Sequence, residues 1–273
     1  MDLSSTLTLN DGTTIPQLGL GVFRAGAGKA TQDAVRWALD VGYRHIDTAH
    51  IYGNEADVGK ALRASGVPRE EVYVTTKLWN ADQGYDETQR AFDISLKALG
   101  TGYVDLYLMH WPVPERRLHS WRAMERLVEQ GSCRSIGVSN FVVRHLEELL
   151  AVAAVVPAVN QIELHPFLQQ RETVALCRAK GIAVEAYSPL TKGRRLDHPA
   201  LVAIAREVGR SPAQILIRWS LQHGFVVLPK SAKNARVLEN AAVFDFELAP
   251  AQMAQLDALE ENLHTAWDPS GAP

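Results

Sequence analysis

The chain has few cysteines, no long apolar segment and no excess of positive charge, and each absence excludes a class of protein. Its 273 residues contain two cysteines, Cys133 and Cys177, which are too few for a disulfide framework. We therefore expect a reducing, cytoplasmic location. The formal net charge of -3 argues against a nucleic-acid partner, because binding to phosphates requires a basic face.

Membrane and metal motifs are also missing. The longest apolar run, residues 149–159, is too short to span a bilayer and contains Pro157. The N-terminus lacks the basic and then apolar order of a signal peptide, so we expect no membrane partner. The sequence has no His-x-His, His-Glu-x-x-His or Gly-x-Ser-x-Gly motif, which predicts neither a metal site nor a serine hydrolase.

What the chain does contain is a repeated alternation of strand-like and helical patterns. Strand-like runs start near residues 18, 44, 72, 104, 135, 158, 183 and 226. Helical patterns cover residues 31–41, 55–65, 86–99, 119–130, 143–152, 170–180, 199–208, 212–222, 233–243 and 250–260. Eight strands, each followed by a helix, indicate a (β/α)8 TIM barrel with an extra C-terminal helix. No linker divides the chain, so we expect residues 1–273 to form one domain.

Two local signals refine this fold. Asp11-Gly12 between short β-prone runs predicts an N-terminal β-hairpin. Gly19 and Gly21 provide two glycines of a dinucleotide fingerprint, but the third is absent and no helix opens there. A doubly wound sheet, the main rival fold, is therefore disfavoured.

Polar residues stand at the ends of the predicted strands, where the chemistry of such a barrel gathers. Asp47, Lys77 and His110 end three successive strands, and Tyr52 follows Asp47 closely. Each alone has a structural explanation. Asp47 could cap a turn and Lys77 could be a surface lysine, while His110 could be a hydrogen-bonded core residue and Tyr52 could pack in a wall. The later strands end at Ser139-Asn140, Gln161-Ile162-Glu163, Tyr187 and Lys230-Ser231.

As a set, these residues suggest proton transfer. A buried lysine requires a carboxylate partner, and Asp47 is on the neighbouring strand. We expect the Lys77 ammonium to lower the pKa of Tyr52 from its reference of roughly 10, making it a proton donor. His110 would then hold a substrate oxygen by a hydrogen bond. Phe23, Trp79 and Trp111 would form either an apolar substrate pocket or ordinary packing.

The tetrad Asp47, Tyr52, Lys77 and His110 resembles that of the aldo-keto reductases, and residues 42–49 and 104–112 resemble the motifs around it. Residues 137–141 and 160–166 resemble the nicotinamide segments, and residues 228–231 with Arg236 resemble the adenosine-phosphate segment. Residues 78–80 and 165–170 are most similar to bacterial 2,5-diketo-D-gluconate reductases.

The resemblance implies NADPH-dependent reduction of a small carbonyl substrate, such as an aldehyde, ketone, dicarbonyl or keto-sugar acid, to an alcohol. It also implies that the protein is a monomer. Tyr52 would be the general acid, tuned by Lys77 and Asp47, and His110 would orient the carbonyl. The implied contacts to NADPH or NADP+ are Gly21, Val22, Asp47, Ser139, Asn140, Gln161, Tyr187, Ser188, Leu190, Lys230, Ser231, Arg236, Glu239 and Asn240. The implied substrate contacts are Phe23, His50, Tyr52, Trp79, His110 and Trp111.

Two segments depart from the family pattern. Residues 191–195 are more basic and bulkier than the usual small loop over the pyrophosphate. The tail after Leu263 is brief, which predicts an open pocket and loose substrate preference. Asn54 is expected to cap the helix that starts at Glu55.

Two other functions stay open at this point. Lys77 suits a Schiff-base lyase, although that leaves Tyr52 and the cluster from Lys230 to Arg236 without a purpose. A non-catalytic, regulatory barrel that keeps the cofactor is the other, because fold does not fix function.

Overall fold

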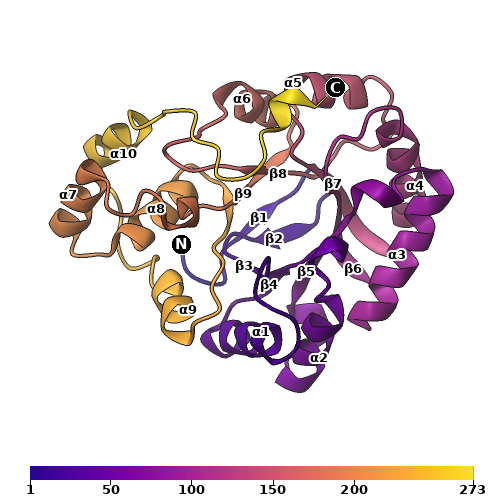
Figure 1. Cartoon of the computed structure of the whole chain (residues 1–273), viewed down its shortest axis with the longest axis horizontal. Coiled ribbons are helices and arrows are strands. Elements are labelled where there is room, and N and C mark those ends of the chain that lie inside the picture. The colour runs from indigo at the N-terminus through magenta and orange to yellow at the C-terminus, as the bar shows by residue number, and fades with distance from the viewer. Residues whose placement is uncertain (273) are drawn as a thin grey trace.

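The structure, a computed structural model, describes residues 1–272 and has a ring of parallel strands inside a ring of helices (Figure 1). The strands of the ring follow chain order from β3 to β10. Their bounds are β3 (Leu20–Gly21), β4 (His45–Asp47), β5 (Tyr73–Leu78), β6 (Val104–Met109), β7 (Cys133–Ser139), β8 (Val159–Glu163), β9 (Ala183–Tyr187) and β10 (Val226–Leu228).

The first and last strands meet and close the barrel. Leu18 bridges Val227 and Gly21 bridges Lys230, both in parallel register. The amide of Gly19 donates to the carbonyl of Val227, 2.9 Å away. A side chain at Gly19 would clash with His45 and Leu228, so glycine permits this close approach. The TIM-barrel prediction is confirmed and the doubly wound alternative is wrong.

Helices surround the strands and bury their apolar faces against them. Their bounds are α1 (Lys29–Val41), α2 (Glu55–Ser65), α3 (Tyr85–Leu99), α4 (Arg117–Glu129), α5 (Val143–Leu150), α6 (Arg171–Ala179), α7 (Pro199–Val208), α8 (Pro212–Gln222), α9 (Asn234–Ala241) and α10 (Pro250–Asp257). Glycines in the left-handed conformation end several of them, as at Gly42 and Gly209. Prolines in the first turn start α7, α8 and α10. Within residues 1–272, no helix is long and apolar enough to cross a membrane.

An antiparallel hairpin, β1 (Thr6–Thr8) and β2 (Thr14–Pro16), forms the floor of the barrel. Leu9 and Ile15 pack against Tyr73, Leu106 and Val226, which belong to the barrel strands. The predicted hairpin is thus confirmed. Its position leaves the opposite end, where the strands finish, free for a site.

Asn54 is the N-cap residue of α2, as predicted, but it caps the helix through its backbone carbonyl and not through its side chain. The helix begins at Glu55, but the Asn54 side chain makes no capping hydrogen bond. It accepts from the Thr48 hydroxyl at 2.8 Å and donates to the carbonyl of Val22 at 3.1 Å. Asn54 therefore ties the segments after β3 and β4 together, beneath the candidate site.

Candidate active site

Asp47 and Lys77 form a buried ion pair at the ends of β4 and β5. The Lys77 Nζ atom donates to both carboxylate oxygens of Asp47, at 2.7 and 2.6 Å, and to the carbonyl of Thr48 at 2.8 Å. Lys77 is fully buried, so its hydrogen bonds replace those that water would supply. Three acceptors hold the ammonium form, which is a poor nucleophile, and this weakens the lyase alternative.

Tyr52 lies on a 3-10 turn, His50–Tyr52, directly after β4. The Lys77 Nζ atom is 5.3 Å from the centre of its ring. Burial raises the pKa of Tyr52 well above its usual value, and the carboxylates of Asp47 and Glu185 raise it further. The expected lowering of this pKa is therefore wrong for the protein by itself. The Lys77 charge is already balanced by Asp47, and the phenol stays protonated.

His110 follows β6 and faces Tyr52, with ring centres 5.8 Å apart. Asn140 fixes its backbone by donating to the His110 carbonyl at 2.9 Å. Burial, and then the charge of Lys77, lower the pKa of His110 well below its usual value. A neutral imidazole carries one N–H donor. His110 can therefore offer a hydrogen bond to an oxygen atom without bringing a charge.

Ser139, Asn140, Gln161 and Tyr187 form a polar group at the ends of β7, β8 and β9. The Tyr187 hydroxyl donates to Asn140 Oδ1 at 2.8 Å, and Ser139 donates to the backbone carbonyl of Gln161 at 2.8 Å. Asn140 has a positive φ of 64°, a conformation that asparagine tolerates better than most residues. These contacts fix the Asn140 amide and the Gln161 backbone at the wall of one cavity.

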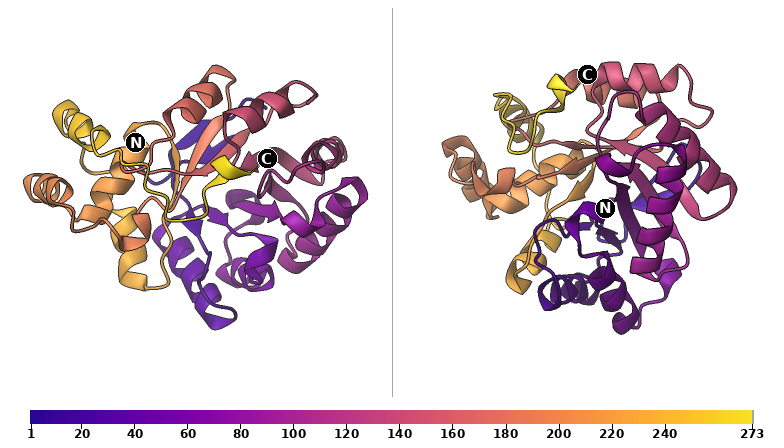
Figure 2. Two further views of the ribbon diagram at one scale, coloured as in Figure 1. Left: turned by 45° about the horizontal axis from the view of Figure 1, so that its top comes forward. Right: turned by 45° about the vertical axis from the view of Figure 1, so that its right-hand side comes forward.

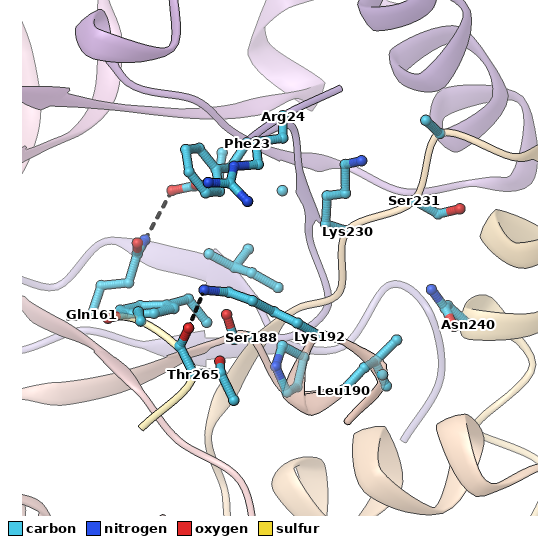
Figure 3. A pocket seen from close by; sticks show the side chains of 18 of the residues that line it. Phe23, Arg24, Gln161, Ser188, Leu190, Lys192, Lys230, Ser231, Asn240 and Thr265 are labelled. Carbon is cyan, nitrogen blue, oxygen red and sulfur yellow. Dashed lines mark hydrogen bonds between the residues drawn. The ribbon is translucent and has the colours of Figure 1, made fainter. Parts of the chain in front are cut away.

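That cavity has a volume of about 1280 Å³, above the ~300–1,000 Å³ of ordinary ligand pockets. Figure 3 shows part of its wall, with Phe23 above, Gln161 at the left, Ser188 and Leu190 below, and Ser231 and Asn240 at the right. Predicted site residues in its lining are Gly21, Phe23, Asp47, Tyr52, Trp79, His110, Trp111, Ser139, Asn140, Gln161, Tyr187, Ser188, Leu190, Lys230, Ser231, Arg236, Glu239 and Asn240.

Two predicted site residues lie elsewhere. Val22 is fully buried in the core and is absent from the cavity lining. His50 is absent from the lining too, and its Nδ1 atom lies 3.3 Å from the carboxylate of Glu55. The ring is held by this neighbouring carboxylate, and a substrate contact of His50 stays a prediction.

The far end of the cavity is basic. Lys230, Lys233 and Arg236 line it, together with the hydroxyl of Ser231. They surround the start of α9, where backbone N–H groups and the helix dipole favour an anion. Burial lowers the pKa of Lys230, as expected for a cation partly removed from water. This end is suited to a phosphate.

The C-terminal tail forms part of the cavity wall, in contrast to the open pocket predicted from its brevity. Thr265, Ala266 and Trp267 line the cavity, and Trp267 packs on Trp111 with ring centres 4.7 Å apart. Figures 1 and 2 show this yellow segment crossing from α10 toward α5. Arg144 on α5 donates to the carbonyls of Ser270 and Ala272 and anchors it.

Glu163 and Lys192 hold the tail at the cavity. The Glu163 carboxylate accepts from the backbone amides of Thr265 and Ala266, at 3.0 and 2.9 Å. The Lys192 Nζ atom donates to the carbonyl of Thr265 at 2.6 Å (Figure 3). The unusual loop of residues 191–195 thus contacts the tail.

Sequence reasoning missed several residues of the site. Arg24, with a positive φ of 55°, lines the cavity beside Phe23, and only its position just after Phe23 pointed to it. Trp267 lies in the tail whose brevity predicted an open pocket, and no motif marks it as a wall residue. Glu185 lies in the barrel interior and carries no motif that marks it. Among the described residues, no three His, Cys, Asp or Glu side chains are grouped to hold a metal ion.

Known proteins match the chain over nearly its whole length. A 9,11-endoperoxide prostaglandin H2 reductase of Trypanosoma cruzi is 50% identical over 266 residues, which cover 96% of this chain and 94% of the relative. A glyoxal reductase of Bacillus subtilis is 48% identical and covers 98% of this chain and 97% of the relative.

Solved structures agree with these relatives. A Bombyx mori aldo-keto reductase in complex with NADP has a TM-score of 0.90 and 38% identity, covering 97% of this chain and 95% of that one. The model of the Aldo/keto reductase family matches residues 17–261. The chain therefore belongs to the aldo/keto reductase family.

Proposed function

We propose that the protein reduces aldehydes and ketones to alcohols with NADPH, on a single domain of residues 1–273. The observation that carries this proposal is one continuous cavity with a neutral proton donor at one end and a basic anion site at the other. Tyr52 and His110 line the first end, and Lys230 and Arg236 line the second. A proton donor and a distant phosphate site in one cavity suit a reaction between a carbonyl compound and a phosphorylated cofactor.

The residues present fit this cofactor. Asn140 and Gln161 provide fixed amide groups for a carboxamide, and the half-buried ring of Tyr187 provides a face for stacking. Lys230, Ser231 and Arg236 would hold the 2′-phosphate, because Lys and Arg donors match an additional anionic group. This preference for extra negative charge is why we propose NADPH rather than NADH. Glu239 and Asn240 would contact the adenine.

The protein's own groups account for the proton. When bound, the reduced nicotinamide supplies a hydride to the carbonyl carbon. Tyr52 donates its hydroxyl proton to the carbonyl oxygen, and the resulting phenolate lies near the Lys77 ammonium. His110, neutral in its buried position, donates a hydrogen bond to the same oxygen and orients the carbonyl. A donor protonated at neutral pH and a neighbouring cation together favour this transfer.

The substrate end of the cavity is aromatic. Phe23, Trp79, Trp111 and Trp267 line it, and Phe23 packs on Tyr52 with ring centres 4.9 Å apart. Such a wall favours reactive dicarbonyls and aromatic aldehydes, which are flat and partly apolar. The likeness to 2,5-diketo-D-gluconate reductases, and hence a keto-sugar acid substrate, stays a prediction because the relatives named above carry other descriptions. A monomeric state and a cytoplasmic location also stay predictions.

The test is NADPH oxidation with methylglyoxal or a nitrobenzaldehyde, in the presence of a chelator. Tyr52→Phe is expected to abolish nearly all turnover while NADPH still binds, since only the proton donor is lost. Turnover at the wild-type level in this variant would remove Tyr52 from the proposal.

The cofactor preference has a separate test. Arg236→Ala is expected to weaken the binding of NADPH by more than tenfold and the binding of NADH by much less, because a charge-assisted hydrogen bond is worth about 1.5–3 kcal/mol. Arg126→Ala is the matched control, because Arg126 is an exposed arginine that pairs with Glu129 on α4. Equal losses of NADPH and NADH affinity in Arg236→Ala would contradict the assigned phosphate contact.

A further inference from the structure

A second buried carboxylate, Glu185, lies beside the catalytic ion pair. It is on β9, is fully buried, and stands opposite Gln161 of β8 in the sheet register. Its Oε2 atom accepts a hydrogen bond from Gln161, whereas its Oε1 atom is buried and has no hydrogen-bond partner among the described residues. Such a costly placement calls for an explanation.

The contacts of Gln161 suggest one. Its Nε2 atom donates to Asp47 Oδ2 at 2.8 Å and to Glu185 Oε2 at 2.6 Å. A side-chain amide has two N–H donors, so these carboxylates use both. Gln161 also lines the cavity (Figure 3). Only its Oε1 atom, an acceptor, is left for a bound ligand.

We propose that Glu185 is a positioning residue that fixes the Gln161 amide with its acceptor oxygen available to the cavity. The site then selects a ligand group that presents N–H donors, as the carboxamide of a nicotinamide does. This inference rests on the proposed function. Without Glu185, one Gln161 donor has no partner, and only the hydrogen bond to Asp47 opposes a turn of the amide that would bring its NH2 group toward the ligand.

The charge state of Glu185 makes this role sensitive to pH. Burial and then the charge of Asp47 raise the pKa of Glu185 to about 8, although Gln161 and Lys77 act in the opposite direction. Burial lowers the pKa of His45 to about 3, so His45 brings no balancing charge. The titratable and charged groups that face Glu185 are His45 and Asp47 on β4, Tyr73 and Lys77 on β5, and Tyr52.

The first test compares two variants by ligand binding. Glu185→Gln keeps an acceptor oxygen but cannot be charged, whereas Glu185→Leu removes the acceptor. The probes are NADPH and its 3-acetylpyridine analogue, which lacks the carboxamide N–H donors, and tryptophan fluorescence measures binding. Wild type and Glu185→Gln should prefer NADPH by on the order of tenfold, the value of one hydrogen bond. Glu185→Leu should show a preference below about twofold.

The second test uses the ligand-free protein and also checks that both variants fold. Between the unfolded pKa of about 4.3 and the raised folded pKa, the folded state binds more protons, so its stability falls as pH rises. The free energy of unfolding of wild type, measured with urea, should therefore fall from pH 6 to pH 9. That of Glu185→Gln should fall less.

Two results would overturn the inference: an unchanged NADPH preference in folded Glu185→Leu, or the wild-type pH slope in Glu185→Gln. Failure of the proposed function gives a different result. In that case wild type binds NADPH yet reduces no carbonyl compound, while the binding preference still reports on Glu185.

Discussion

Replacing Lys77 by methionine tests whether the ion pair at the centre of the site also limits the stability of the barrel. The change removes the ammonium, which is fully buried, and leaves the Asp47 carboxylate, whose side chain is 5% exposed. Removing one partner of a buried pair costs about 3–5 kcal/mol, because the remaining charge is uncompensated. Gln161 still donates to Asp47 at 2.8 Å. We therefore expect a loss at the lower end, about 3 kcal/mol.

A second variant separates the lost contact from the stranded charge. In Lys77→Met combined with Asp47→Asn, no charge of the pair remains, so the double variant should be more stable than Lys77→Met alone. A surface pair is the control: Lys29 and Asp33 on α1 are 2.9 Å apart, with side chains 84% and 18% exposed. Lys29→Met should cost at most about 1 kcal/mol.

Urea unfolding at pH 7, followed by tryptophan fluorescence and circular dichroism, measures wild type, Lys77→Met, Asp47→Asn, the double variant and Lys29→Met. The reasoning is refuted if Lys77→Met costs no more than Lys29→Met. It is also refuted if the double variant loses as much as the two single losses added together, because a stranded charge requires a non-additive result.

Three further predictions follow from packing, charge and the cavity wall. Gly59→Ala should destabilise by about 3 kcal/mol or more, because a Cβ atom there overlaps the Leu99 carbonyl, whereas Gly271→Ala, with open space around it, should be neutral in thermal unfolding. Because the pKa of His110 is lowered well below 6.5, His110 is already neutral at pH 6, so log(kcat/KM) should show no histidine ionisation between pH 6 and 7.5; an inflection that His110→Gln abolishes would contradict this. Trp267→Ala should reduce kcat/KM for nitrobenzaldehyde about tenfold, through loss of an aromatic contact of ~0.5–1.5 kcal/mol and its buried area. Methylglyoxal, which is too small to need that wall, serves as the control, and equal losses for both substrates would argue against an aromatic wall role.

The fold was readable from the sequence because its signals are local and repeated. Every barrel strand starts within two residues of its predicted position, and α2, α7 and α8 have the predicted bounds. These helices have clear boundaries, such as the proline at the start of α8 and the glycine after α7. Closure of the barrel was inferred only from the count of βα units, since no local pattern encodes the bridge between Gly21 and Lys230.

Site residues at the ends of strands could be predicted from the sequence. Properties that depend on tertiary packing could not. The placement of Asp47 beside Lys77 follows from neighbouring parallel strands. The pKa of Tyr52 depends on its burial and on Glu185, which lies far away in sequence. The direction of His50 depends on Glu55, and the wall role of Trp267 depends on the anchor that Arg144 gives the tail. None of these contacts has a spacing that a sequence pattern reports.

The closing contact between the first and last strands also orders events during synthesis. Leu18 emerges from the ribosome early, but its partner Val227 is made near the end, and chain growth proceeds at about 5–20 residues per second. Any part of the sheet that forms before then has two unpaired edges, which other chains can join. The hairpin floor is made first and can cover apolar residues of the early strands. The basic end of the cavity, carried by Lys230 and α9, is completed only when the barrel itself is.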